Sequence, residues 1–227
     1  MSPTTLPRHP RRVALAWITA GAAVISSVLT PYQPAFAAAS PAEFAAAFVA
    51  FDHAAGDPSA VDLAATQFTR LSAADPADPV LRAYAGASTT MRATTTWLPW
   101  KKLSFAEDGL ALIDKALAQL TPAHDLPAYR GTPASLETRF VAASTWLAMP
   151  TMMNRHDRGV RQLAEVQASP LFSAAPLPFR ASVWLRAATE AEASQHPDEA
   201  RRLLQQVVAS GAPQASAAQA RLNGIKP

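Results

Sequence analysis

The stretch from Met149 to His156, Met-Pro-Thr-Met-Met-Asn-Arg-His, concentrates side chains that could hold a metal ion. Thioether sulfur and imidazole nitrogen suit the soft ion Cu(I). Met149, Met152 and His156 have a spacing that a bent turn could gather around one ion, and Met153 adds another sulfur. The same methionines could instead fill a core at a helix junction interrupted by Pro150, because methionine adapts to irregular gaps. We expect the packing role, since the chain holds no second cluster of such ligands.

Motifs of the common catalytic classes are absent from the sequence. There is no H-E-x-x-H zinc motif, no G-x-S-x-G nucleophile turn, no phosphate loop and no dinucleotide fingerprint. The chain has no cysteine, and therefore no thiol nucleophile, disulfide or zinc-thiolate site. The acidic pairs Glu107-Asp108 and Glu190/Glu192 are better explained as exposed helix faces than as paired acid and base. The sequence therefore predicts a protein that is not an enzyme and needs no cofactor.

Aromatic and cationic residues gather in the stretch Thr-Trp-Leu-Pro-Trp-Lys-Lys, which holds Trp97, Trp100, Lys101 and Lys102. Pro99 disfavours continuation of the preceding helix, so we expect an elaborated connection between two helices. Two roles are open for the tryptophans. They could plug a gap between helix layers, with the lysines in solvent. Alternatively, the four side chains form a contact surface of the residue types enriched at binding hot spots.

Three arginines, Arg155, Arg158 and Arg161, recur every third residue along one predicted helix. Such a row is usually a solvated helix face. The alternative is a surface for an acidic partner, and we therefore keep Arg155 and Arg158 among the candidate binding residues.

The elements that must position these residues are helices. Alanine dominates the composition and favours helices, since it loses no side-chain entropy on helix formation. Apolar residues at helical spacing, such as Leu110, Ile113 and Leu117, mark the buried faces. No segment alternates with period two, so no β-sheet is expected. The predicted helices are 41–55, 58–73, 79–95, 104–120, 133–149, 155–168, 177–194, 197–210 and 213–222.

Helix-start signals support these boundaries. Ser40-Pro41-Ala42-Glu43 and Ser104-Phe105-Ala106-Glu107 are capping-box patterns, and Asp57-Pro58 and Asp78-Pro79 combine a capping side chain with a proline for the first helical position. Most connections are short, so consecutive helices are expected to pack as antiparallel pairs.

Paired helices of this length invite a search for an internal repeat. Ala64, Phe68 and Leu71, followed by Pro76, resemble the second helix of a tetratricopeptide repeat. The same pattern recurs at Ala200, Leu204 and Val207, with Pro213 one residue late. The interval from Ala64 to Ala200 is a multiple of the thirty-four-residue repeat length. Trp184 and Ala188 fall where the repeat's first helix has tryptophan and glycine. Departures from the pattern are Ala187, Ala191 and Asp52.

The chain is thus similar to tetratricopeptide-repeat proteins over about 41–76 and 181–214, whereas 94–175 keeps only the pairing of helices. The resemblance implies an all-α right-handed solenoid of stacked helix pairs. It also implies a concave groove that binds a peptide or a partner protein.

The amino-terminal region reads as an export signal. Arg8, Arg11 and Arg12 precede an uncharged apolar run, 13–29, and the small-x-small sequence ending at Ala37 is typical of a cleavage site. We expect a signal peptide at 1–37, a helical repeat domain at 38–227, and a periplasmic or secreted protein. The alternative is that the run is retained as a membrane anchor, although its length is at the short end for a membrane span.

The net charge of +3 comes from that leader. Without its three arginines the remaining Lys and Arg balance the Asp and Glu, which removes the electrostatic support for nucleic-acid binding. Membrane contact is expected only if the leader is retained. The hypothesis from sequence is therefore an exported, non-catalytic protein that binds a protein or peptide partner. The alternative is a soluble carrier of a copper ion or small ligand, using the methionine cluster or a pocket near Trp97 and Trp100.

Overall fold

A computed structural model describes Met1 and residues 39–225 of the chain, and within these residues the protein is all-helical. The α-helices of this part are α1 (Pro41–His53), α2 (Pro58–Ala74), α3 (Pro79–Thr95), α4 (Pro99–Ala118), α5 (Ala134–Ala148), α6 (His156–Ala168), α7 (Leu177–Ala193), α8 (Pro197–Ala209) and α9 (Ala215–Gly224). Short 3-10 helices, η1 (Pro122–Asp125) and η2 (Thr151–Met153), flank α5. The described residues form no strand, only an isolated bridge between Pro127 and Pro133. The predicted all-α class is confirmed for this part of the chain.

The predicted signal peptide and its cleavage site after Ala37 lie, Met1 apart, outside the described residues. Between 39 and 225, no helix is both long and apolar enough to cross a bilayer.

The first three helices begin as their sequence signals predict. Ser40 Oγ accepts a hydrogen bond from the Glu43 backbone N–H, and the Glu43 carboxylate accepts one from the Ser40 N–H. Asp57 caps α2 through the N–H of Ser59, and Asp78 caps α3 through two backbone N–H groups. Each cap satisfies donors that the first helical turn would otherwise leave unpaired.

The start of α4 differs from the prediction. We expected a helix from Ser104, but α4 begins at Pro99, five residues earlier. Proline lacks an N–H and has a preset φ, so it fits the first helical position, and Pro99 starts the helix instead of blocking it. Ser104 consequently lies inside α4, where its hydroxyl donates to Asp108 Oδ2 at 3.1 Å rather than capping a terminus.

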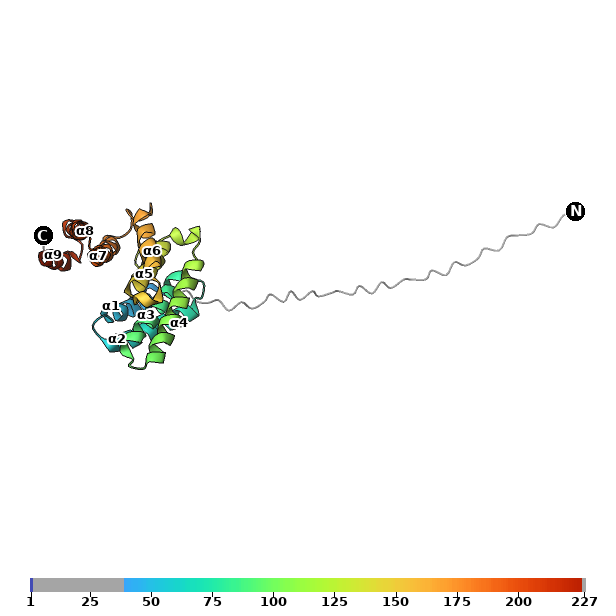
Figure 1. Ribbon diagram of the computed structural model, residues 1–227. Helices are drawn as coiled ribbons and strands as arrows, with labels where there is room; N and C mark the ends of the chain where they lie inside the picture. The colour runs from blue at the N-terminus through green and yellow to red at the C-terminus, as the bar shows by residue number, and fades with distance from the viewer. Residues whose placement is uncertain (2–38, 226–227) are drawn as a thin grey trace. The chain divides into compact units, whose positions relative to one another are not determined.

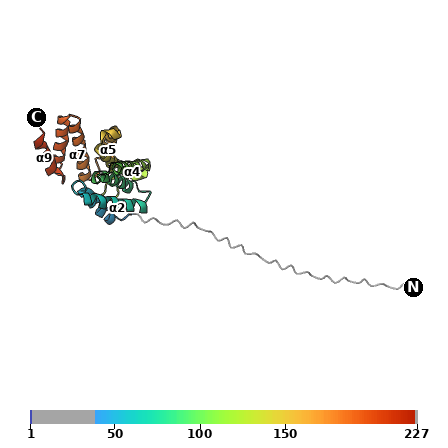
Figure 2. The same cartoon turned by 60° about the horizontal axis from the view of Figure 1, so that its bottom comes forward.

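Consecutive helices pack on one another, and α5 lies at the centre of the packing. Contacts join α1 to α2, α2 to α3, α3 to α4, α5 to α6, α7 to α8 and α8 to α9, while α5 also packs on α3 and α4. In both views α7, α8 and α9 run beside one another at the carboxyl-terminal end (Figures 1 and 2). Side chains of α5 contribute to all three hydrophobic clusters. The amino-terminal turns of α5 are therefore buried almost completely, from Ala134 to Thr138.

Helices α3 and α4 cross in close backbone contact at two glycines, Gly86 and Gly109. A Cβ atom added at Gly109 would lie 2.5 Å from the carbonyl oxygen of Gly86 and 2.8 Å from the backbone nitrogen of Thr90. A Cβ at Gly86 would lie 2.7 Å from the Gly109 carbonyl oxygen. The two glycines thus allow backbone-to-backbone contact, which fixes where α4 lies on α3.

Candidate functional site

Three exposed large apolar side chains gather at the start of α4. Trp97 is 82% exposed, Trp100 66% and Leu103 52%. Lys101 and Lys102 are also exposed, and neither forms an ion pair with a described residue. We call these five residues the α4 surface. Isolated exposed apolar residues are common, but three within seven positions, two of them tryptophans, are the sequence's clearest mark of a contact site.

The α4 surface is held by contacts one turn further along the helix. The guanidinium of Arg92, on α3, lies 4.6 Å from the ring centroid of Phe105. The same arginine donates from Nε to Asp62 Oδ1 on α2 at 2.9 Å. Together with the Gly86–Gly109 crossing, this chain of contacts fixes α4 against α3 and α2. The exposed tryptophans are therefore presented from a supported helix.

The gap-filling interpretation of Trp97 and Trp100 is wrong. Both rings lie on the surface of the described residues, Trp97 in the α3–α4 connection and Trp100 in the first turn of α4. The contact-surface interpretation of Trp97, Trp100, Lys101 and Lys102 stays a prediction, and the exposure of the rings favours it.

The arginine row does not form one solvated face. Arg158 Nη2 donates to Asp114 Oδ1 on α4 at 2.6 Å, and its guanidinium lies 4.2 Å from the ring centroid of Trp146 on α5. Arg155 Nη1 lies 3.5 Å from Asp114 Oδ2. These two arginines join α6 to α4 and α5, which gives them a structural role. Arg161 is exposed.

The methionine–histidine cluster is divided among different surroundings. Met149 and Met153 pack against the hydrophobic cluster of Leu110, Ile113 and Trp146, whereas Met152 is 82% exposed. His156 Nε2 lies 2.7 Å from Glu190 Oε1. Packing thus accounts for Met149 and Met153, as we expected.

No group of three or more His, Cys, Asp or Glu side chains in the described residues is arranged to hold a metal. A copper site at Met149, Met152 and His156 stays a prediction that these contacts do not favour.

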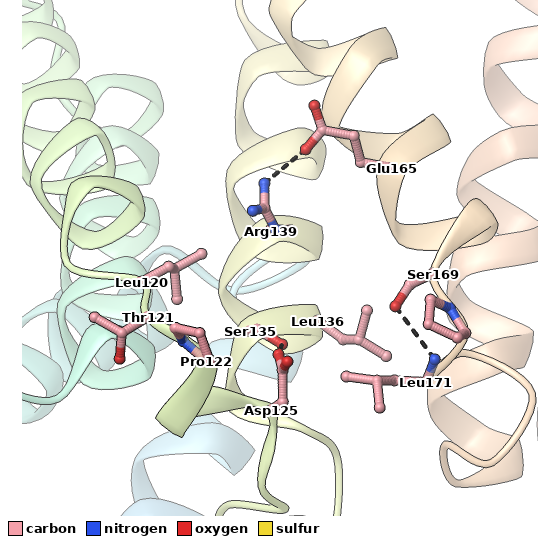
Figure 3. Close-up of a pocket in the computed structure, with 11 residues that line it drawn as sticks. Leu120, Thr121, Pro122, Asp125, Ser135, Leu136, Arg139, Glu165, Ser169 and Leu171 are labelled. Carbon is pink, nitrogen blue, oxygen red and sulfur yellow. Dashed lines mark hydrogen bonds and ion pairs between the residues drawn. The ribbon is translucent and has the colours of Figure 1, made fainter.

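A cleft of about 470 Å³ lies over the amino-terminal half of α5. Figure 3 shows its floor on α5, with the α4–α5 connection on one side and the end of α6 with the following turn on the other. Its polar groups pair with one another: Arg139 Nη1 donates to Glu165 Oε2 at 2.6 Å, and Ser135 Oγ donates to Asp125 Oδ1 at 2.6 Å. Ser135 has only the Asp125 carboxylate beside it, and no histidine or lysine is among the residues that line the cleft.

A buried polar cluster between α3 and α5 escaped the sequence reasoning. Glu137 is fully buried, and its Oε1 accepts hydrogen bonds from the Tyr84 hydroxyl at 2.8 Å and from Arg130 Nε at 3.0 Å. Arg130 also lies over the ring of Phe48, 4.0 Å from its centroid. The residues come from distant parts of the sequence, and a lone glutamate in a helix gives no signal of burial. The cluster ties α5 to α3 and is a structural element.

Two tyrosines, Tyr84 and Tyr129, are expected to make the folded protein less stable at alkaline pH. Burial raises the pKa of the Tyr84 hydroxyl, and the neighbouring Glu137 charge raises it further. Burial and the hydrogen bond to Asp78 raise the pKa of Tyr129. A raised pKa means that the folded protein keeps these protons more tightly than the unfolded chain does. Their stabilising contribution is complete below about pH 10, the ordinary tyrosine pKa, and is lost as pH rises above it.

We therefore expect the free energy of unfolding to fall steeply above about pH 10. Urea unfolding at a series of pH values measures this. The Tyr84→Phe/Tyr129→Phe variant should show a shallower alkaline decline, because it has lost the two groups. An identical decline in both proteins would contradict the assignment.

Comparison with known proteins adds no relative: no protein-family model, no curated protein and no solved structure matches this chain.

Proposed function

We propose that the chain is an exported helical-repeat protein that binds a protein or peptide partner through the α4 surface and performs no catalysis. The observation that carries the proposal is the exposure of Trp97 and Trp100 beside Lys101 and Lys102. A tryptophan offers about 150–250 Å² of surface, so covering two mostly exposed rings yields on the order of 5 kcal/mol at about 25 cal/mol per Å². That gain is before the costs of association, and it suffices to anchor a partner.

Burial at the repeat positions supports a tetratricopeptide-like arrangement of antiparallel helix pairs in a right-handed solenoid. Ala64, Phe68 and Leu71 of α2 are buried, as are their counterparts Ala200, Leu204 and Val207 of α8. Small side chains at the first position allow the two helices of a pair to approach closely. The pairs α1–α2 and α7–α8 are both in contact.

The proposed location follows from the leader. The arginines at 8, 11 and 12, the apolar run 13–29 and the small residues before 38 favour export with cleavage near Ala37. The protein would then act in the periplasm or outside the cell. Mass spectrometry of the mature protein tests this, since cleavage gives a chain that begins at Ala38.

The partner proposal is tested by crosslinking in the native host followed by mass spectrometry. We expect one dominant partner with the unchanged protein and its loss with Trp97→Ala/Trp100→Ala. The matched control is Leu63→Ala/Leu126→Ala, which removes two other exposed apolar side chains and should keep the partner. All variants should unfold within about 0.5 kcal/mol of the parent, because the sites are exposed. A partner that survives the tryptophan substitutions would refute the α4 surface.

The alternative to a protein partner at the α4 surface is a membrane, since tryptophan and lysine also favour lipid interfaces. Sedimentation with anionic phosphatidylglycerol vesicles separates the two. Binding to vesicles that requires Trp97 and Trp100, with no protein partner recovered, would replace the protein-binding proposal.

A further inference from the structure

A second groove, of about 610 Å³, lies between α6 and the helices α7 and α8. Its apolar part consists largely of small or short side chains, among them Val160, Ala164, Ala187 and Ala191. Val160 is 38% exposed although it is aliphatic. Since α6 and α7 make few direct contacts with each other, the space between them is left open.

The charges around this groove are unequal. Three carboxylates line it, those of Asp157, Glu190 and Glu199, against one guanidinium, that of Arg161. Asp157 is 91% exposed in its side chain, and its nearest basic group is His156 Nδ1 at 3.8 Å. Glu199 is 55% exposed in its side chain and lies 3.6 Å from Arg202.

The third carboxylate closes one side of the groove. Glu190 Oε1 lies 2.7 Å from His156 Nε2, which joins α7 to the start of α6. It also accepts a hydrogen bond from Ser194 Oγ at 3.3 Å. This carboxylate is therefore fixed in place, while Asp157 and Glu199 stay accessible to a ligand.

We infer that this groove binds a basic peptide segment in which lysine or arginine alternates with small or aliphatic residues. The inference rests on the proposed partner-binding function and adds a second contact region to it. Aliphatic side chains of the segment pack on the exposed Val160 and Ala164, and its cationic groups meet Asp157 and Glu199. A charged group alone would leave the apolar part of the groove uncovered, so the ligand class is a peptide rather than a simple polyamine.

Fluorescence anisotropy with a short fluorescein-labelled peptide of alternating lysine and leucine tests the inference on the full chain. We expect saturable binding that weakens as salt is added, because exposed charges are screened. The same peptide with glutamate in place of lysine should not bind, and the polyamine spermine should bind more weakly. Val160→Ser should also weaken peptide binding by removing part of the apolar contact.

Charge variants give the sharpest comparison. Asp157→Asn should weaken binding about three-fold and Asp157→Asn/Glu199→Gln about ten-fold, as expected for one and two partly exposed charge contacts. Asp198→Asn is the matched control: Asp198 also lies in the first turn of its helix, is 96% exposed in its side chain, and does not line the groove. It makes the same change in net charge and should leave the affinity within about two-fold, because its contribution is only long-range.

Three results would overturn the inference: equal weakening by Asp157→Asn and Asp198→Asn, equal binding of the glutamate peptide, or spermine binding as tightly as the lysine peptide. Trp97→Ala/Trp100→Ala should keep peptide binding even where it abolishes partner crosslinking. The experiments therefore distinguish a groove that does not bind the peptide from an α4 surface that does not bind the protein partner.

Discussion

Gly109→Ala should lower the free energy of unfolding by about 3 kcal/mol, at the upper end for overpacking a core. The added methyl group would lie 2.5 Å from the Gly86 carbonyl oxygen and 2.8 Å from the Thr90 backbone nitrogen. Backbone atoms of α3 cannot rotate aside as a flexible side chain can, so the two helices must move apart. The sign of this change in stability tests the close contact, because replacing glycine by alanine in a helix ordinarily raises the free energy of unfolding by up to about 1 kcal/mol.

Urea unfolding of Gly109→Ala beside Gly224→Ala measures this effect. Gly224 also lies in a helix, and a Cβ there would have no neighbour within 4 Å. We expect Gly224→Ala to be neutral or slightly stabilising. A Gly109→Ala variant as stable as the parent would mean that α3 and α4 do not cross at these glycines. The position of the α4 surface on α3 would then need revision.

Glu137→Ala should also cost about 3 kcal/mol, the lower end of the range for breaking a buried ion pair. The substitution leaves Arg130 without its carboxylate and the Tyr84 hydroxyl without its acceptor. The low end applies because the Arg130 side chain is 33% exposed, so water can partly hydrate the charge that remains.

A double-mutant cycle with Arg130→Met distinguishes the ion pair from simple loss of packing. If Arg130 and Glu137 stabilise each other, the double variant should be less destabilised than the sum of the two single variants. Thermal and urea unfolding of the four proteins provide the measurement. Strict additivity would show that the two charges do not interact in solution.

Helix existence could be predicted from the sequence because the physical signals are local. The capping side chains of Ser40, Asp57 and Asp78 lie within three residues of the donors they satisfy, and the predicted starts of α1, α2 and α3 agree with the structure. At Pro99 the same kind of reasoning failed. A proline both stops one helix and starts another, and only the packing of α4 on α3 shows that the second role applies.

The candidate site was only partly predictable. Residue types singled out Trp97, Trp100, Lys101 and Lys102, but the sequence left open whether the two rings are buried or exposed. The partners of Arg155 and Arg158 lie on helices remote in sequence, as do those of Glu137. Periodicity along one helix carries no information about which distant carboxylate or ring faces a side chain.

Site-specific photo-crosslinking tests the central claim, that the α4 surface contacts a protein partner. In one strain of the native host, Trp100 is replaced by p-benzoylphenylalanine. In a second strain, the same replacement is made at Leu126, another exposed apolar residue. We predict a discrete protein adduct from position 100 and none of the same mass from position 126. The same adducts from both positions, or no protein adduct from position 100, would contradict the account.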